Sequence, residues 1–266
     1  MHFILSLIMC LLAPALVAQS SNLVTLETGE DGRGWEGVGR LDIAGKGFCT
    51  AALIEDDLVL TAAHCLYGFN DELLAPDRFT FLAGLRNGRA EATRGVSRMV
   101  AHPDYIADGP SSDLSGVAMD IAVLKLDRPI RHTRIQPFAV SSRPQRGDSI
   151  GVVSYGAGRE DAPSLEEVCS VLGRQSGSIV MSCDVEHGSS GSPVFTLADG
   201  APRIVSVVSA MAHVEGDKVS LGTSLEAPLQ ELLAHFASIG PAQPSGTQSL
   251  ISIGERNTTG AKFVRP

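Results

Sequence analysis

Long hydrophobic runs, aromatic residues and clustered basic residues are all scarce in this chain of 266 residues. Aromatics make up only 5% of it, Lys and Arg form no run, and the formal net charge is -9. Without a basic cluster, nucleic-acid binding is not expected. The chain also has no CxxC pair and no close cluster of His. A metal site is therefore disfavoured, and we expect no metal and no cofactor.

One extended apolar run occurs at the start of the chain. It covers residues 3–12 and gives way to Ala13-Pro14-Ala15, which is typical of a secretory signal peptide. The run is shorter than the roughly 20 residues that a membrane-spanning helix needs. We therefore expect a signal peptide at 1–18, an extension at 19–36, and a secreted or periplasmic protein without stable membrane insertion.

Four cysteines remain once the leader and its Cys10 are set aside: Cys49, Cys65, Cys169 and Cys183. An even number in an exported chain indicates two disulfides. Sequence alone allows three pairings. The local one joins Cys49 to Cys65 and Cys169 to Cys183, closing two loops of about 15 residues, each contributing about 3 kcal/mol in the chain-entropy model.

Short β-branched runs separated by Gly, Pro, Asp and Ser fill residues 37–236. Many short strands with frequent turns predict an all-β sandwich or pair of barrels. A stretch rich in Pro, Arg and Ser separates a first lobe, 37–135, from a second, 136–236. Apolar residues at helical spacing predict a helix from Leu225 to Phe236 that closes the second lobe. Residues 237–266 are expected to form a flexible tail.

Three segments carry candidate chemistry. Ser190 stands in His187-Gly-Ser-Ser-Gly-Ser-Pro193, where small neighbours suit a nucleophile and Gly188 allows backbone N–H groups to converge on one point. His64 follows an apolar strand in Thr-Ala-Ala-His-Cys, and Asp120 precedes another in Asp-Ile-Ala-Val-Leu. Taken singly, a Gly- and Ser-rich stretch is more often a plain turn, a His after a strand is more often structural, and an Asp before a strand is more often a turn or cap residue.

Taken together, the order His, Asp, Ser and the three contexts resemble the trypsin/chymotrypsin family over Gly37 to Phe236. The resemblance extends especially to its bacterial secreted branch, which includes the glutamyl endopeptidases. It implies two six-stranded antiparallel β-barrels with the active site between them, a Cys49–Cys65 disulfide, and a protein or peptide substrate. In this family the Ser attacks, the His transfers the proton and the Asp orients the His. The resemblance therefore assigns these roles to Ser190, His64 and Asp120, with an oxyanion hole at the N–H groups of Gly188 and Ser190.

Some positions depart from the family's pattern. Animal members have an Asp just before the nucleophile, paired with a freshly cut N-terminal amine, whereas this chain has Ser189. Activity is therefore predicted not to need a buried N-terminal amine.

The side-chain specificity of cleavage is less clearly marked in the sequence. Asp184 lies six residues before Ser190, which is the spacing of the Asp at the base of the substrate pocket that favours Arg or Lys, although a structural role remains open. Val208 stands where the glutamyl endopeptidases have a His that recognises a Glu of the substrate, so specificity for Glu is disfavoured. The edge strand that pairs with substrate is assigned to Ser209, Ala210 and Met211, where a bulky Met could narrow the pocket.

Rivals for these roles have weaker contexts. His102 is interpreted as structural, Asp113 has no apolar strand after it, and Ser189 and Ser192 lack the position between Gly188 and Gly191. Two other functions remain open: a catalytically silent binding protein on the same scaffold, and a periplasmic quality-control protease. The protein is expected to act as a monomer.

Overall fold

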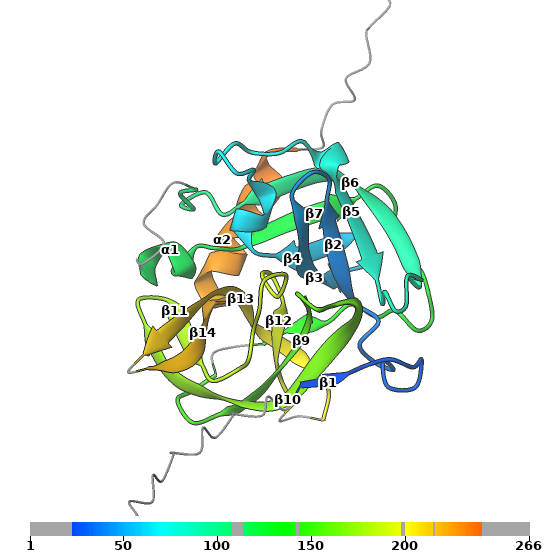
Figure 1. Cartoon of the computed structure of the whole chain (residues 1–266). Helices are drawn as coiled ribbons and strands as arrows, with labels where there is room; N and C mark the ends of the chain where they lie inside the picture. The colour runs from blue at the N-terminus through cyan, green and yellow to red at the C-terminus, as the bar shows by residue number, and fades with distance from the viewer. Residues whose placement is uncertain (1–22, 108–113, 142–143, 198–199, 215, 241–266) are drawn as a thin grey trace, which may run out of the picture.

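The computed structural model describes residues 23–107, 114–141, 144–197, 200–214 and 216–240. The expected signal peptide at 1–18 and most of the expected tail at 237–266 lie outside these residues. The described chain is built mainly from β-strands arranged as two barrels, one above the other in the view of Figure 1.

The first barrel closes six antiparallel strands in the order β2-β3-β4-β7-β6-β5. Their bounds are β2 (Val38–Ile43), β3 (Gly47–Glu55), β4 (Leu58–Thr61), β5 (Phe79–Ala83), β6 (Ala92–Ala101) and β7 (Ala122–Leu126). Alternation of side chains sets which face is buried, as in β5, where Phe79, Phe81 and Ala83 are buried and the residues between them are partly exposed. Two 3-10 turns, η1 (Ala63–Leu66) and η2 (Pro76–Arg78), and the short helix α1 (Leu114–Ala118) lie in its connections.

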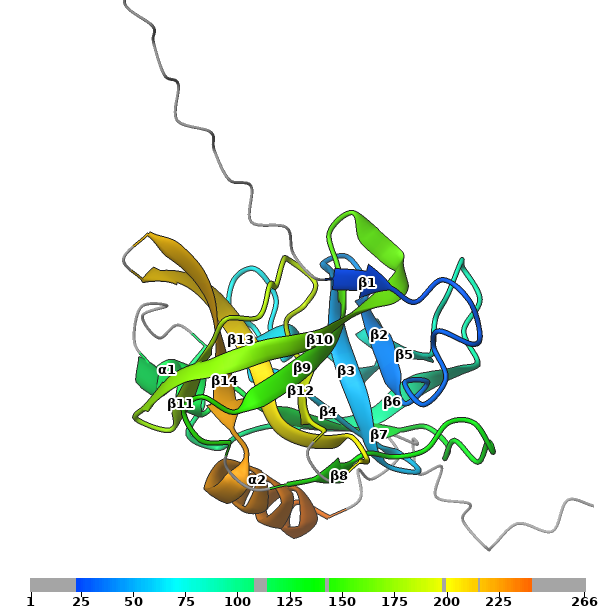
Figure 2. The ribbon, with the colours of Figure 1, turned by 90° about the horizontal axis from the view of Figure 1, so that it is seen from below.

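The second barrel is a ring of β9-β10-β11-β14-β13-β12, closed by the antiparallel pairing of β10 with β9. Its strands are β9 (Ser149–Gly156), β10 (Arg159–Gln175), β11 (Ser178–Met181), β12 (Pro193–Thr196), β13 (Arg203–Val214) and β14 (Asp217–Ser224). Two short strands add to it: β1 (Leu23–Thr25) on β10, and β8 (Ala139–Val140), parallel to β13. Figure 2 shows β1 and β8 lying on different sides of this ring. The predicted fold of two six-stranded barrels is confirmed.

Buried contacts join the barrels. Tyr155 of β9 is fully buried and donates its hydroxyl to the carbonyl oxygen of Leu85, at 2.9 Å. The backbone N–H of Tyr155 donates to the hydroxyl of Thr50 in β3, at 3.0 Å. The seam between the barrels is therefore packed and hydrogen-bonded, so residues supplied by either barrel are held in fixed relation.

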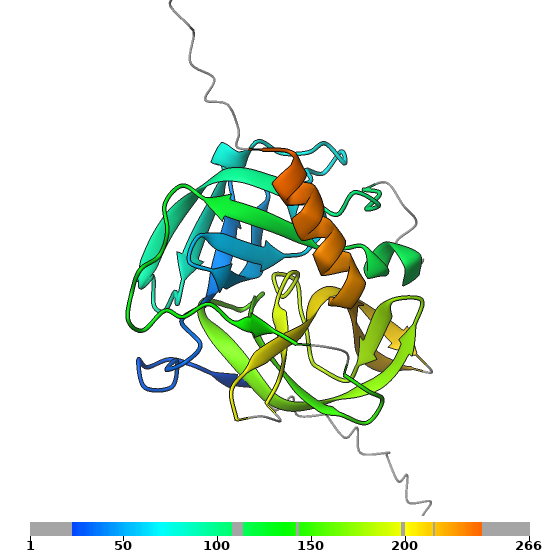
Figure 3. The same ribbon diagram turned by 180° about the vertical axis from the view of Figure 1, so that it is seen from behind.

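The helix α2 (Glu226–Ser238) ends the described chain, close to the predicted bounds. It follows the second barrel, but it packs mainly against β6 and β7 of the first (Figure 3). Leu229 and Leu232 are buried in a core cluster that includes residues of both barrels, and Arg98 lies over the ring of Phe236. The helix thus packs mainly on the first barrel, whereas the sequence had suggested that it closes the second lobe. No helix within the described ranges is both long and apolar enough to cross a membrane.

Candidate active site

His64 is placed by the end of β4 and the 3-10 turn that follows it. Ala62 and Ala63 are fully buried, which explains why only small residues precede the His. A disulfide from Cys65 to Cys49 ties the turn to β3. Lys46 donates to the carbonyl oxygen of His64, at 3.0 Å. The backbone around His64 is therefore fixed from two sides, while its side chain remains about one third exposed (32%).

Asp120 lies just before β7 and is almost completely buried. Its Oδ2 accepts a hydrogen bond from Nδ1 of His64, at 2.7 Å, and its Oδ1 accepts one from the backbone N–H of His64, at 2.9 Å. Burial alone would raise the pKa of Asp120, but the charge and hydrogen bonds of His64, with a bond from Ser209, outweigh it and hold the pKa below its usual range. The carboxylate is thus kept ionised and fixes the orientation of the imidazole.

Ser209 supplies a third hydrogen bond to Asp120, from its Oγ to Oδ2 at 2.5 Å. It sits where the register of β13 against β14 shifts between Val208 and Ala210, an irregularity of the kind that often changes the direction of a side chain next to an active site. The sequence assigned Ser209 to the substrate-binding edge through its backbone. The structure gives its hydroxyl a separate contact with the proposed triad.

Substituting Ser209 with Ala is therefore predicted to lower kcat by about tenfold, because a hydrogen bond to a charged, buried group is lost. KM should change little, since the backbone of β13 stays in place. Steady-state kinetics on a peptide substrate measure both values. His213→Ala, an exposed change on the same strand, is the matched control, and an equal kcat for Ser209→Ala and wild type would contradict the prediction.

Ser190 lies between two glycines that the fold requires. Gly188 and Gly191 both have positive φ values, 94° and 80°, which side-chain-bearing residues rarely adopt. A Cβ on Gly188 would overlap the ring of Phe48, and one on Gly191 would overlap the hydroxyl of Thr61. The Gly-x-Ser-Gly pattern thus reflects close packing of the Ser190 loop against the first barrel.

Thr50 links this loop to the part of the first barrel that carries His64. Its backbone N–H donates to the carbonyl oxygen of Ser190, at 2.8 Å, and its hydroxyl donates to that of Gly188, at 2.9 Å. The neighbouring Cys49 is bonded to Cys65, next to His64. Strand β3 therefore positions the Ser190 loop and the His64 turn together.

The N–H groups around Ser190 divide into two sets. Those of Ser189 and Gly191 donate to backbone carbonyl oxygens of Glu186 and Val208. Within the described residues, the N–H groups of Gly188 and Ser190 make no hydrogen bond. Within the same residues, no hydrogen bond joins the Ser190 hydroxyl to the His64 ring. Without substrate, hydrogen bonds between catalytic groups are often long or poorly aligned, and they tighten when substrate binds.

A hollow of about 300 Å³ adjoins Ser190. The residues that line it are Val185, Glu186, His187, Ser190, Val208, Ser209, Ala210 and Met211. Met211 is 38% exposed and leaves this space open. Asp184 does not line the hollow, and its carboxylate is bonded to Lys218 Nζ at 2.7 Å.

Ser189, the residue before Ser190, is fully buried and engaged on several sides. Its hydroxyl accepts bonds from the guanidinium of Arg159 and the N–H of Glu186, both at 3.2 Å, and donates to the carbonyl oxygen of Tyr155 at 3.3 Å. Arg159 is itself anchored on the carbonyl oxygen of Ser154, at 2.6 Å, and on its hydroxyl. A neutral side chain with an internal arginine thus supports the Ser190 loop.

The second disulfide joins Cys169 to Cys183 and holds β10 to the segment that leads to Ser190. Both disulfides lie in groups that could otherwise suggest metal ligation, since His64 adjoins one and Glu166 the other. Their cysteines are oxidised and offer no thiolate, the form in which Cys binds metals.

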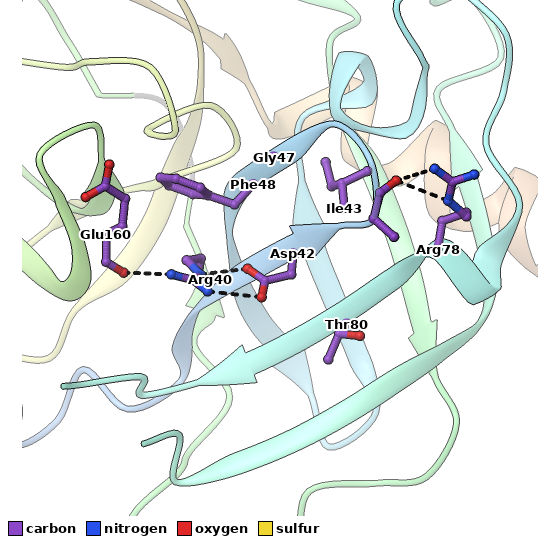
Figure 4. Close-up of a pocket in the computed structure, with 9 residues that line it drawn as sticks. Arg40, Asp42, Ile43, Gly47, Phe48, Arg78, Thr80 and Glu160 are labelled. Atoms are coloured by element: carbon purple, nitrogen blue, oxygen red, sulfur yellow. Dashed lines mark hydrogen bonds and ion pairs between the residues drawn. The ribbon is translucent and has the colours of Figure 1, made fainter. Parts of the chain in front are cut away.

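A larger hollow, about 510 Å³, lies on the first barrel beside Phe48 (Figure 4). Its charged groups bond to one another and to the backbone. Arg40 binds the carboxylate of Asp42 at 2.6 and 3.0 Å and donates to the carbonyl oxygen of Glu160, at 3.1 Å. Glu160 belongs to the second barrel, so this contact fixes the two barrels relative to each other close to the Ser190 loop.

Comparison with known proteins places this geometry in a family. The trypsin family model matches residues 31–223. Human serine protease 56 is 30% identical over 138 residues, which cover 50% of this chain and 21% of that protein. Human mannan-binding lectin serine protease 1 is 28% identical over 124 residues, covering 41% of this chain and 17% of that protein. The chain thus spans about a fifth of the length of these curated relatives.

Among solved structures, one of a Glu endopeptidase in complex with MPD superposes with a TM-score of 0.68 at 19% sequence identity, covering 84% of this chain and 100% of that one. At this identity the likeness concerns the fold alone. The family model, by contrast, covers most of the chain and includes His64, Asp120 and Ser190. The chain therefore belongs to the trypsin family.

Proposed function

We propose that the protein is a secreted serine endopeptidase that hydrolyses peptide bonds through an acyl-enzyme intermediate. Ser190 is the nucleophile, His64 the general base and Asp120 the residue that orients it. The observation that carries the proposal is the 2.7 Å bond between His64 Nδ1 and a buried, ionised Asp120, beside a loop that presents a serine between two glycines. The roles are those of the trypsin-like triad.

In the proposed reaction, Oγ of Ser190 attacks the peptide carbonyl carbon while Nε2 of His64 takes its proton. The tetrahedral intermediate carries a negative oxygen, which the N–H groups of Gly188 and Ser190 would bind; both are without another hydrogen bond in the described chain. His64 then gives the proton to the leaving amine, and the C–N bond breaks. Water, activated by His64, hydrolyses the resulting ester and restores Ser190.

The substrate is a protein or peptide, whose backbone would pair with the edge of β13 at Ser209, Ala210 and Met211. Two observations support this arrangement: the three residues line the hollow beside Ser190, and Ala210 and Met211 are accessible to solvent. Asp184, the residue expected at the base of this pocket, lies outside the residues that line it and pairs with Lys218. The enzyme is proposed to work as a monomer in an oxidising compartment, where its two disulfides persist.

The test is digestion of an unfolded protein followed by sequencing of the new termini. Wild type should generate new ends, while His64→Ala, which removes the base, should generate almost none. His132→Ala, an exposed histidine on the first lobe, is the matched control and should digest like wild type. A folded wild-type protein that produces no new ends would instead favour a catalytically silent binding protein.

We also propose that activity does not depend on a buried N-terminal amine, because Arg159 and Tyr155 already hold Ser189. A variant with extra residues ahead of Leu23 is predicted to keep kcat within about twofold of the unextended form. Arg159→Met should lower kcat by about tenfold, since the loss leaves buried polar groups unpaired. Complete loss of activity on N-terminal extension would contradict this proposal.

A further inference from the structure

The hollow beside Ser190 has a mainly apolar wall. Four of its lining residues are Val185, Val208, Ala210 and Met211, and Val185 and Val208 are buried. Apolar walls favour an uncharged side chain in the bound peptide, because a charge placed there would lose its hydration without compensation. The selectivity of the pocket then depends on whether a free carboxylate faces it.

Two carboxylates flank this wall. Asp184 and Glu186 lie on either side of Val185 in the segment that leads to Ser190. Lys218 binds both: its Nζ is 2.7 Å from Oδ1 of Asp184 and 2.5 Å from Oε1 of Glu186. Glu186 itself lines the hollow, so the ammonium group holds a carboxylate that would otherwise be free at the pocket.

Lys218 is fixed in place and charged. It lies on β14 opposite His213 of β13, in the hairpin that also carries Met211. Burial alone would lower the pKa of Lys218, but hydrogen bonds to Asp184 and Glu186 outweigh it and raise the pKa. The lysine therefore stays protonated throughout the neutral pH range.

The backbone of the same segment is held independently. The N–H of Asp184 donates to Oε2 of the buried Glu166, at 2.6 Å, and the preceding Cys183 is bonded to Cys169. Arg159 adds a second positive charge that interacts electrostatically with both Asp184 and Glu186. Removing Lys218 should thus free the carboxylates without unfolding the wall.

We propose that Lys218 is a specificity-determining residue: it holds Asp184 outside the pocket and neutralises Glu186 at the pocket's wall, so that the pocket accepts an uncharged aliphatic side chain in preference to Arg or Lys. This inference rests on the proposed peptidase function and names its substrate class. It explains how the chain can have an acid at the spacing typical of Arg-selective relatives without presenting it to substrate.

The test compares kcat/KM for matched peptides with Leu, Ala, Glu or Arg before the cleaved bond. Wild type should prefer Leu or Ala. Lys218→Met should raise the ratio of Arg to Leu cleavage by about tenfold, since one partner of a charge network is removed. Adding Glu186→Gln and Asp184→Asn to that variant should restore the wild-type ratio. Lys218→Gln is a second variant should Lys218→Met fold poorly, as judged by thermal unfolding.

Lys125→Met is the matched control, because Lys125 pairs with Asp57 at 2.8 Å on the first barrel, outside the residues that line the hollow. The ratio of Arg to Leu cleavage in Lys125→Met should equal that of wild type. An active wild type that prefers Arg, or an unchanged ratio in Lys218→Met, would overturn the inference alone. A folded wild type that cleaves none of the peptides would overturn the proposed function, and this inference with it.

Discussion

Replacing Asp120 with Asn is expected to lower kcat by about 10⁴-fold while the protein stays folded, as the corresponding change does in trypsin-like enzymes. The physical reason lies in the number of donors around this side chain. Three groups donate to Asp120: the ring and the backbone N–H of His64, and the hydroxyl of Ser209. An amide has one oxygen to accept them, so its NH₂ group must face a donor or His64 must change tautomer.

The altered tautomer places a proton on Nε2 of His64, which then cannot accept one from Ser190. Steady-state kinetics at neutral pH, with thermal unfolding as the check on folding, measure the effect. Asp57→Asn is the matched control, because Asp57 pairs with Lys125 on the surface of the first barrel and should leave kcat unchanged. A loss below about tenfold for Asp120→Asn would mean that this carboxylate does not orient the base.

Replacing Ser190 with Ala is expected to lower kcat by about 10⁶-fold, the scale of nucleophile removal in a Ser-His-Asp enzyme. The substitution removes only a partly exposed hydroxyl and leaves the backbone bond from Thr50 intact. Stability should therefore stay close to that of wild type. The residual rate is measured with a sensitive fluorogenic peptide and enzyme at high concentration.

The neighbouring Ser192 offers a matched control. Its hydroxyl is buried and has no hydrogen-bond partner in the described chain, so Ser192→Ala removes no bond and should keep full activity. Comparing Ser190→Ala with Ser192→Ala therefore distinguishes the nucleophile from a neighbouring serine without a role in the reaction. Equal activity in Ser190→Ala and wild type would assign the chemistry to another residue.

The features that the sequence predicted correctly are local. Short β-branched runs between turn residues predict strands, apolar residues at helical spacing predict α2, and closely spaced cysteines favour the disulfide pairs that the structure contains. The two glycines beside Ser190 could be noticed because backbone strain and close packing restrict residue type at those two positions.

The features that sequence reasoning missed depend on contacts between distant parts of the chain. Ser209 meets Asp120 across 89 positions, and Thr50 meets Gly188 across 138. Lys218 reaches Asp184 across 34 positions, which changes the interpretation of an acid with the expected spacing. A Ser, a Thr or a Lys within a strand carries no local signal of such a partner, because many folds would place it facing solvent.

The position of α2 was also hard to predict because it depends on contacts between distant parts of the chain. Its spacing of leucines shows which face is apolar but not which barrel covers that face. In the structure the face packs against β6 and β7, and Glu231 on the helix approaches the buried His102, at 3.5 Å. The segment that follows the second barrel thus stabilises the first, the one that carries His64 and Asp120.

The most direct test of the account is covalent labelling with a fluorophosphonate probe, followed by peptide mapping. Such probes react with a serine only where a base activates its hydroxyl and an oxyanion hole receives the phosphoryl oxygen. The account predicts a single adduct on Ser190, absent from Ser190→Ala, greatly slowed in His64→Ala and retained in Ser192→Ala. A folded wild-type protein that forms no adduct, or forms it on another residue, would contradict the assignment of Ser190 as the nucleophile.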